Sequence, residues 1–238
     1  MESRSAELVE LSGGMAQVHW RRSLRARRVS LRLDPRDGVV IVTLPPRTAR
    51  NVGVALLKDN AAWVMQRLAA LPTAVRFEDG ATVSLAGGQY RIRHVGTAGA
   101  STRRGAVWLK DDEIHVAGDG AFLRRRVTDF LRAEAHRRLS ALVVDKAKSA
   151  QLRASRVTVK DTRTRWGSCT ANGALAFSWR LVMAPLFVQD YVVAHEVAHL
   201  RHMNHGPAFW KLVEALSPHV RPAAAWLRDE GARLLRVG

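Results

Sequence analysis

The chain has 238 residues, of which 47% are hydrophobic and 25% are charged, and it contains a single cysteine. This composition is that of a globular protein with one large domain or two small ones, and it excludes general disorder. One cysteine excludes an internal disulfide framework, and no apolar run approaches the roughly 18 residues of a membrane span. The N-terminus lacks the basic-then-apolar layout of a signal peptide, so we expect a cytoplasmic protein with no membrane partner.

The charge is unusual, because 38 lysine and arginine residues outnumber 21 aspartate and glutamate residues, for a formal net charge of +17. Residues 120–170 alone hold 13 of the basic residues and four acidic ones, which gives +9. The stretch "FLRRRVTDFLRAEAHRRLS" fits either a solvated helix face or a surface for polyanions. Nucleic acid or nucleotide phosphate is therefore a possible partner of this basic surface.

The N-terminal half is predicted to consist mainly of short strands. "RRVSLRL" and "GVVIVTLP" flank the turn-rich "DPRDG", and alternating apolar residues in the first segment indicate a half-buried hairpin. "LPPRTARNVGVALLKDNAAWVMQRLAAL" then predicts one amphipathic helix. Its apolar face would carry Val52, Leu56, Trp63, Val64 and Leu68. Further strands are expected in "ATVSLAGGQYRIRHV" and "AVWLKDDEIHVAG".

From about Ala121 the pattern changes to helices, beginning with a long one that reaches Lys148. "TRWGSCTANGALAFSW" interrupts them and predicts a hairpin whose two loop residues are Asn172 and Gly173. In that register Trp166 lies opposite Trp179. Helices follow in "LFVQDYVVAHEVAHLRH", "GPAFWKLVEAL" and "AAAWLRDEGARLL".

These elements predict an α+β protein with a boundary near Gly118. Residues 1–118 would form a β-rich N-terminal domain with one helix. Residues 119–238 would form a second domain that carries the histidine-rich helix.

The stretch "HEVAHLRHMNH", residues 195–205, holds four of the nine histidines of the chain. His195 and His199 are four residues apart, so on a helix they lie on one face and can bind one Zn²⁺. Glu196 projects beside them and can meet a water molecule on the metal. H-E-x-x-H is the zinc-hydrolase pattern in which this glutamate is the general base.

An open zinc site needs a third protein ligand. The candidates are His202, His205, Glu214 and Glu230. On one rigid helix His202 would lie about 10 Å from His195 along the axis, too far to complete a tetrahedral site. His205 stands between Asn204 and Gly206-Pro207, where one helix ends and another begins. A chain that turns back there favours His205, with Glu214 next.

The motifs "HEVAHLRHMNHGPAFW" and "RWGSC" together resemble the YgjP-like family of zincin-type metal-dependent hydrolases, over most of the chain. The resemblance implies a zincin-like catalytic domain, with His195, His199 and His205 as zinc ligands and Glu196 as catalytic base. The ending "NHGPAFW" is also similar, over a short stretch, to WLM and SprT-like proteases, which act on proteins bound to DNA.

The motif "RWGSC" offers one candidate for substrate binding. Arg165 is that candidate, because a hairpin just before the metal helix is placed to border the cleft. Trp166 is expected in the core, and Gly167 is expected to permit close approach to another backbone. With three histidines available, Cys169 is expected to be a buried thiol and not a ligand or nucleophile.

The sequence therefore favours a zinc-dependent hydrolase, most simply a metallopeptidase that uses metal-activated water with Glu196 as general base. The same apparatus can hydrolyse the phosphoanhydride of a nucleotide, and the basic surface leaves a DNA-associated protease as another alternative. A non-catalytic, zinc-stabilised binding module would leave Glu196 without a role. The absence of G-x-x-x-x-G-K-[ST] excludes a P-loop NTPase.

Overall fold

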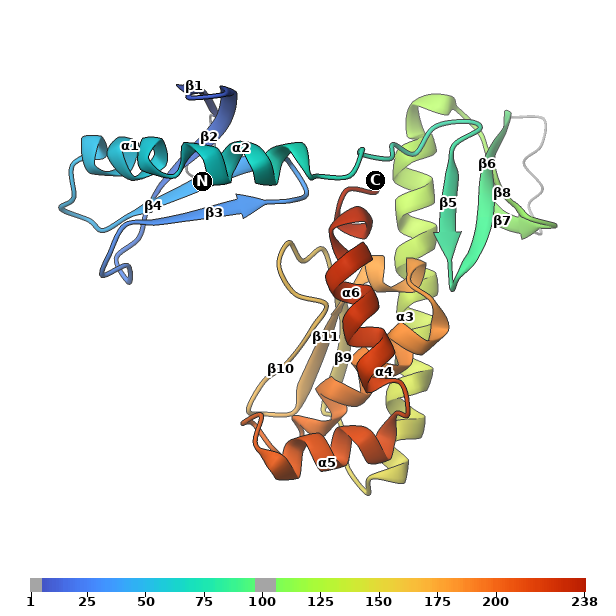
Figure 1. The fold of residues 1–238 in the computed structure, drawn as a ribbon. Helices are drawn as coiled ribbons and strands as arrows, with labels where there is room; N and C mark the ends of the chain where they lie inside the picture. Colours follow the sequence, from blue (N-terminus) through green and yellow to red (C-terminus); the bar gives the residue numbers. More distant parts are fainter. Residues whose placement is uncertain (1–5, 97–105) are drawn as a thin grey trace. The chain divides into compact units, whose positions relative to one another are not determined.

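The computed structural model describes residues 6–96 and 106–238, and the chain divides into two compact units between Thr73 and Ala74 (Figure 1). The boundary that the sequence predicted, near Gly118, lies inside the second unit. The core of that unit explains the difference, as described below.

The first unit is a four-stranded sheet with two helices on one face (Figure 1). The strands, in spatial order, are β1 (Glu7–Leu11), β2 (Gly14–Arg22), β4 (Val39–Leu44) and β3 (Ser30–Asp34). β2 and β4 are parallel, whereas the other neighbours are antiparallel. The β3–β4 pair confirms the hairpin predicted on either side of "DPRDG".

The single helix predicted after the prolines is wrong, because the structure has two: α1 (Arg50–Asp59) and α2 (Ala61–Ala69). Asn60 separates them, and its side-chain amide donates to the carbonyl of Leu56 at 2.8 Å. An asparagine that bonds to nearby backbone in this way competes with helix continuation. Part of the predicted apolar face is exposed, because Val52 is 48% exposed and Trp63 is 40% exposed, whereas Gly53 and Leu57 are the buried residues of α1.

The second unit is built around one long helix, α3 (Leu123–Ser149), as predicted (Figure 1). A sheet of β5 (Thr82–Leu85), β6 (Gly88–Gly96), β8 (Glu113–Ala117) and β7 (Val107–Lys110) packs on one side of it. A smaller sheet contacts α3 through β9. Its strands, in spatial order, are β10 (Gly167–Cys169), β11 (Ala174–Ser178) and β9 (Arg156–Lys160).

Short and long helices complete this unit. They are the 3₁₀ helices η1 (Gly120–Phe122) and η2 (Trp179–Met183), followed by α4 (Leu186–Ala198), α5 (Pro207–Leu216) and α6 (Val220–Leu235). Mixed helices and sheets of this kind confirm the α+β class. In the described ranges, no helix has the combination of length and apolar character needed to cross a bilayer.

The core of the second unit is continuous across α3. Buried residues recur along this helix at about every fourth position, from Leu123 to Ala147. They pack in one cluster with Ile92 and Ile114 of the four-stranded β5–β6–β8–β7 sheet and with Phe177 of β11. Because α3 shares its apolar surface with both sheets, the strands before Gly118 belong to the same unit as the helices after it.

The hairpin of β10 and β11 forms as predicted, but its register differs by one residue. Thr170 opposes Ala174, which leaves a three-residue loop that ends at Gly173 with φ +78°. Trp166 is therefore opposite Ser178, not Trp179. A glycine in the left-handed region after a turn is typical of three-residue hairpin loops. Trp179 lies beyond the end of β11 and begins η2.

Candidate metal centre

Helix α4 carries the first candidate ligand, His195, and its C-cap residue, His199, is the second. The helix contains no glycine or proline, and its valines at positions 188, 192, 193 and 197 are buried. At its start, the Gln189 side chain donates to the carbonyls of Val182 and Ala184, at 3.2 Å and 2.8 Å. These bonds fix the helix to η2, and the two histidines one turn apart near its end lie beside each other, with ring centroids 5.0 Å apart.

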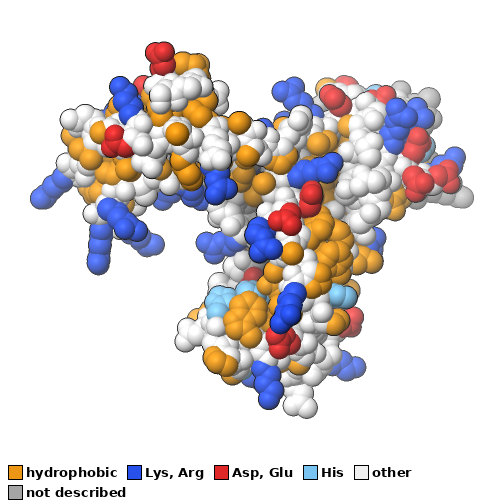
Figure 2. Space-filling view, in the orientation of Figure 1, with side chains coloured by type: hydrophobic (Ala, Val, Ile, Leu, Met, Phe, Trp, Pro, Cys, Tyr) orange, Lys and Arg blue, Asp and Glu red, His pale blue; other side chains and the backbone are white. Residues whose placement is uncertain are grey.

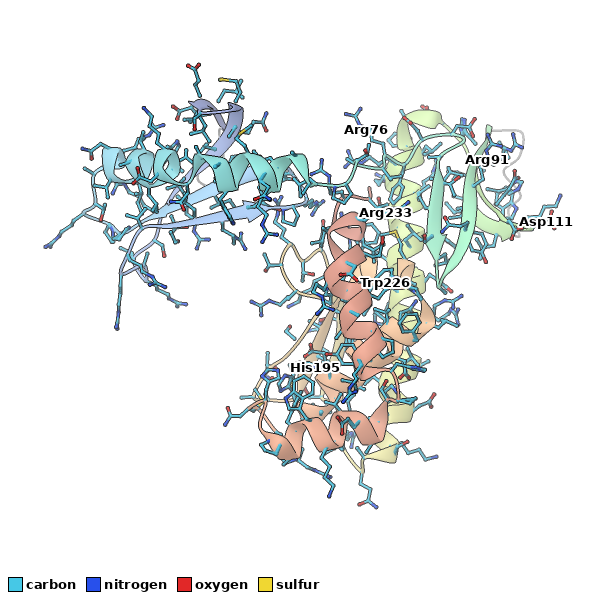
Figure 3. The ribbon with its side chains drawn as sticks, viewed as in Figure 1. Arg76, Arg91, Asp111, His195, Trp226 and Arg233 are labelled. Atoms are coloured by element: carbon cyan, nitrogen blue, oxygen red, sulfur yellow. The ribbon has the colours of Figure 1, made fainter. Side chains whose placement is uncertain are left out.

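The chain turns back after α4 and brings in the third candidate. α4 ends at Ala198, and α5 begins at Pro207 after the N-cap residue Gly206. In between, His205 returns over the end of α4, so that its Nε2 lies 3.1 Å from Nε2 of His195. Figure 3 labels His195, the first of these histidines. One nitrogen from each of His195, His199 and His205 lies within 4.8 Å of the other two. The structure thus brings together the three histidines that the sequence predicted as ligands.

The other candidates are not part of this group. His202 contributes its backbone, because its carbonyl accepts a hydrogen bond from Nδ1 of His199 at 3.0 Å. Glu214 is exposed on α5, and Glu230 on α6 forms an ion pair with Arg233 at 3.8 Å. The bond to His202 matters for the site, since it fixes the proton on Nδ1 of His199 and leaves Nε2 as a ligand atom.

The three imidazoles fit a zinc ion by distance and by charge. Two nitrogens bound to one tetrahedral zinc at about 2.0–2.1 Å are about 3.3 Å apart, close to the 3.1 Å between His205 and His195. Burial, with smaller effects of His199 and His205, lowers the pKa of His195 to about 4. Burial likewise lowers the pKa of His199. Both rings are therefore neutral at neutral pH, as a metal ligand must be.

Phe209 forms the floor of the site. Its side chain is fully buried, and its ring centroid lies 4.9 Å from that of His195, 4.5 Å from His199 and 4.7 Å from His205. Phe209 was not among the site residues predicted from the sequence. Contact with all three rings limits how far each can rotate, so Phe209 supports the arrangement of the ligands.

Glu196 lies on the buried side of the same helix turn. It is 6% exposed, and burial raises the pKa of its carboxyl to about 7, against the opposing charge of Arg165. Gly167 on β10 faces it directly: a Cβ at position 167 would lie 2.5 Å from Cγ and from Oε1 of Glu196. The close approach that the sequence predicted for Gly167 is thus to a side chain and not to a backbone.

Strand β10 borders the centre as the free edge of its sheet. Trp166 and Thr170 bond to β11 through their backbone groups. In an antiparallel pair these bonding positions alternate, so the N–H and C=O groups of Gly167 and Cys169 point to the open side. Arg165, which is exposed, precedes this edge and acts electrostatically on Glu196. The predicted substrate-contact residue therefore lies near the candidate general base.

Two further residues adjoin Glu196. Cys169 is half-buried, and burial together with the charge of Glu196 raises the pKa of its thiol. It is outside the histidine group. Tyr191, which the sequence analysis missed, has its ring 6.0 Å from that of His195, and burial together with Glu196 raises the pKa of its hydroxyl. Its position four residues before His195 could have revealed it, because that spacing puts both on one helix face.

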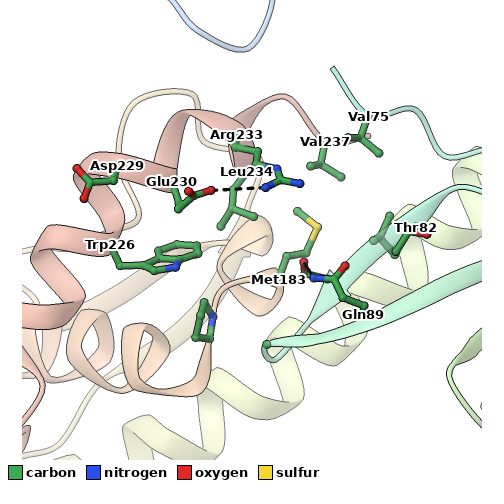
Figure 4. Close-up of a pocket in the computed structure, with 14 residues that line it drawn as sticks. Val75, Thr82, Gln89, Met183, Trp226, Asp229, Glu230, Arg233, Leu234 and Val237 are labelled. Atoms are coloured by element: carbon green, nitrogen blue, oxygen red, sulfur yellow. Dashed lines mark hydrogen bonds and ion pairs between the residues drawn. The ribbon is translucent and has the colours of Figure 1, made fainter. Parts of the chain in front are cut away.

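A cavity elsewhere in the second unit is separate from this centre. It has a volume of about 460 Å³ and lies between α6 and the β5–β6 hairpin (Figure 4). Trp226, Glu230 and Arg233 line it from the helix, and Thr82 and Gln89 from the hairpin. None of the three histidines lines this cavity, so it contributes no group to the metal centre.

Comparison with known proteins agrees with this geometry. The model of the YgjP-like family, described as a metallopeptidase domain, matches residues 27–230. No curated protein and no solved structure matches the chain. The family match covers most of the chain, including all three histidines, Glu196 and the β10 edge. The chain therefore belongs to the YgjP-like family of metallopeptidase domains.

Proposed function

We propose that this protein is a zinc-dependent peptidase, with His195, His199 and His205 as metal ligands and Glu196 as general base. The observation that carries the proposal is the position of Glu196. It is next to a ligand in sequence, it is buried, and it is in contact with the free edge strand β10. A buried carboxyl group at this place has no ion-pair partner among the described residues, which fits a catalytic role better than a structural one.

The chemistry follows from these residues. When bound, a zinc ion supplies a Lewis acid that polarises a carbonyl oxygen and makes water more nucleophilic at neutral pH. Glu196 accepts a proton from the water molecule as the water oxygen attacks the carbonyl carbon. It then delivers that proton to the amide nitrogen as the C–N bond breaks. His202, through its carbonyl, keeps His199 in the tautomer that presents Nε2.

The edge of β10 supports a peptide as the substrate. An extended chain can add to a free sheet edge by backbone hydrogen bonds, here with Gly167 and Cys169. Such a chain would pass beside Glu196, because Gly167 touches that side chain. Arg165, just before the strand, is placed to contact a carbonyl or carboxylate group of the substrate.

The test is a side-by-side assay of zinc-loaded protein on a peptide library and on nucleoside triphosphates. We expect peptide cleavage, and we expect Glu196→Gln to lower kcat at least about 100-fold, since general acid–base catalysis contributes about 10²–10⁴-fold. Zinc content, measured by elemental analysis, should stay near one per chain in that variant. Glu214→Gln, the same substitution at an exposed glutamate, is the matched control and should retain activity.

Three results would contradict the proposal. Hydrolysis of nucleotides with peptides left intact would replace a peptidase by a phosphoanhydride hydrolase. Undiminished turnover of Glu196→Gln at full zinc content would remove the general base. No turnover of either substrate class, with tightly held zinc, would indicate a zinc-stabilised binding module.

A further inference from the structure

The first unit carries a dense group of arginines at the end of β2, in the β2–β3 loop and in β3. Residues 21–32, "RRSLRARRVSLR", contain six arginines and no acidic residue. All six are exposed, and we refer to the five that make no side-chain hydrogen bond or ion pair among the described residues as the arginine surface: Arg21, Arg25, Arg27, Arg28 and Arg32. Figure 2 shows lysine and arginine side chains extending into solvent from the end of the first unit where the β2–β3 loop lies.

The sixth arginine, Arg22, has a structural role that holds this loop in place. Its Nη1 donates to the carbonyls of Pro45, Pro46 and Thr48, at 3.3 Å, 2.7 Å and 3.0 Å. The backbone of Ser23 bonds to Leu44, and Ala26 N bonds back to Ser23 O at 3.1 Å to close a turn. These hydrogen bonds hold the loop backbone in place, so the arginine side chains extend from an ordered backbone.

The guanidinium groups of the arginine surface are without protein partners. Within residues 6–96 and 106–238, none of the five forms an ion pair or a side-chain hydrogen bond. Like charges this close repel one another, so the group is costly unless an anion binds it. An arginine without a partner also keeps all five N–H donors available for phosphate oxygens.

The basic helix α3, whose sequence also fits a surface for polyanions, is different. Glu134 forms ion pairs with Arg137 and Arg138, at 2.6 Å for the first. Asp161 lies 3.8 Å from Arg132, and Arg126 donates to the carbonyl of Ala117. Much of the positive charge of α3 is thus balanced inside the protein. The first unit differs in that five arginines without such partners lie within residues 21–32.

The arginine surface continues onto the sheet face opposite α1 and α2. The helix-covered face carries Val18, Val40 and Val42. Because side chains alternate along a strand, Arg21 and Arg32 point to the other face. The register places Arg21 beside Thr43, and His19 and Arg32 beside Ile41. Strand spacing puts the Cα atoms of the two arginines roughly 12 Å apart, within reach of one short stretch of a polyanion.

We propose that the arginine surface binds the sugar–phosphate backbone of single-stranded nucleic acid, with little sequence preference. Guanidinium groups contact phosphates in a bidentate manner. Half-buried His19 and Ile41 on the same sheet face, and Leu24 in the loop, which is 92% exposed, offer surfaces for unstacked bases. A duplex hides its bases and would leave these side chains unused. The inference goes beyond the proposed peptidase activity, since no residue of the metal centre takes part.

A membrane surface is the other polyanion to consider. Binding to a bilayer commonly uses a helix with a large apolar face beside the basic residues. Within residues 21–32, Leu24 is the one large apolar side chain that is strongly exposed, and these residues form a loop and strand ends with no helix. One leucine supplies little insertion energy, so the structure favours nucleic acid.

The test uses the full chain and a fluorescent oligothymidine of about 20 nucleotides, with binding measured by anisotropy at several salt concentrations. The variant is the triple substitution Arg25→Gln, Arg27→Gln and Arg28→Gln, which changes exposed loop side chains only. We expect its affinity to fall at least about tenfold at low salt. The slope of log K against log salt should become less steep by about 2, because each phosphate contact on a single strand contributes about 0.7.

The matched control removes the same charge elsewhere, by Arg124→Gln, Arg125→Gln and Arg221→Gln, all at exposed positions. It should bind within about threefold of the native protein. Equal loss in both variants, or loss in the control alone, would overturn the proposal in favour of net charge or of α3. Absence of binding by the native protein at low salt would also overturn it. So would binding to phosphatidylserine vesicles without binding to the oligonucleotide.

Discussion

Gly167 on β10 and Glu196 on α4 are in direct contact. A Cβ at position 167 would lie 2.5 Å from Oε1 of the glutamate, closer than real Cβ atoms approach other groups. The glycine of "RWGSC" and the glutamate of the histidine motif, 29 residues apart, therefore form one structural feature. A side chain at residue 167 would force either the edge strand or Glu196 to shift.

We expect Gly167→Ala to displace Glu196 and lower kcat about tenfold or more, while zinc content stays near one per chain. Overpacking of this kind costs about 1–3 kcal/mol of stability. Kinetics and elemental analysis on the same preparation measure both effects. Gly206→Ala is the matched control, because a Cβ there meets no atom within 4 Å. A Gly167→Ala protein with native kcat would show that Glu196 does not depend on this contact.

The ligand set predicts how each histidine variant holds zinc. His195→Ala, His199→Ala and His205→Ala should each lose most of the metal during purification, since three protein ligands are needed. His202→Ala should retain it, because position 202 supports His199 through its backbone carbonyl, which alanine also has. Elemental analysis distinguishes these cases. Loss of zinc from His202→Ala with retention in His205→Ala would reverse the assignment.

The buried carboxyl of Glu196 predicts a pH-dependent stability difference in the metal-free protein. Burial raises its pKa to about 7 from an ordinary value of 4.5. The folded chain thus holds this proton more tightly than the unfolded chain, so the destabilising effect is absent below pH 4.5, grows between the two values and is complete above about pH 7. Glu196→Gln should match the native free energy of unfolding near pH 4. Near pH 8 it should exceed that value by on the order of 2–3 kcal/mol.

Urea denaturation of chelator-treated protein measures this difference, with Glu214→Gln as the exposed control. The control should show no comparable gain at either pH. Equal stability of native protein and Glu196→Gln at the higher pH would mean that Glu196 is better solvated in solution than in the structure.

Arg180 predicts a large loss of stability on substitution. Its side chain is 1% exposed, pairs with Asp161 and donates from Nε to the carbonyl of Val237 at 3.1 Å. Its guanidinium also lies over the Trp179 ring, 4.2 Å from the centroid. Arg180→Met should lower the free energy of unfolding by about 3 kcal/mol, because it leaves a carboxylate and a carbonyl without this donor. Denaturation of the variant measures the loss, and a change below about 1 kcal/mol would contradict it.

The candidate site was more predictable from sequence than the strands around it. Spacing places His195 and His199 on one helix face, and Gly206-Pro207 signals the turn that returns His205. The hairpin register depended on whether Gly173 is the second or the third loop residue, and "ANG" permits both. The contact between Gly167 and Glu196 depends on how a strand packs on a helix, which a linear pattern does not encode.

The division of the chain was less predictable for a related reason. A change from strands to helices near Gly118 suggests a boundary, but α3 buries apolar side chains toward the strands that precede it as well as toward those that follow. Only packing reveals that this helix is shared. Asn60 offers a similar case, because an asparagine inside an amphipathic pattern is compatible with a continuous helix until its side chain is seen to bond to Leu56.

The shared core of α3 has a consequence for the dynamics of the second unit. β6 and β8 lie in the same apolar cluster as α4, through Ile92, Ile114 and Val193. Elements that share one core tend to open together, so the amide hydrogens of those strands should exchange with solvent through the same opening as those of α4. A metal ion that binds only the folded form slows that opening. Bound zinc should therefore slow amide hydrogen exchange in β6 and β8, which it does not touch. Exchange in these strands would then measure whether the three histidines hold a metal ion.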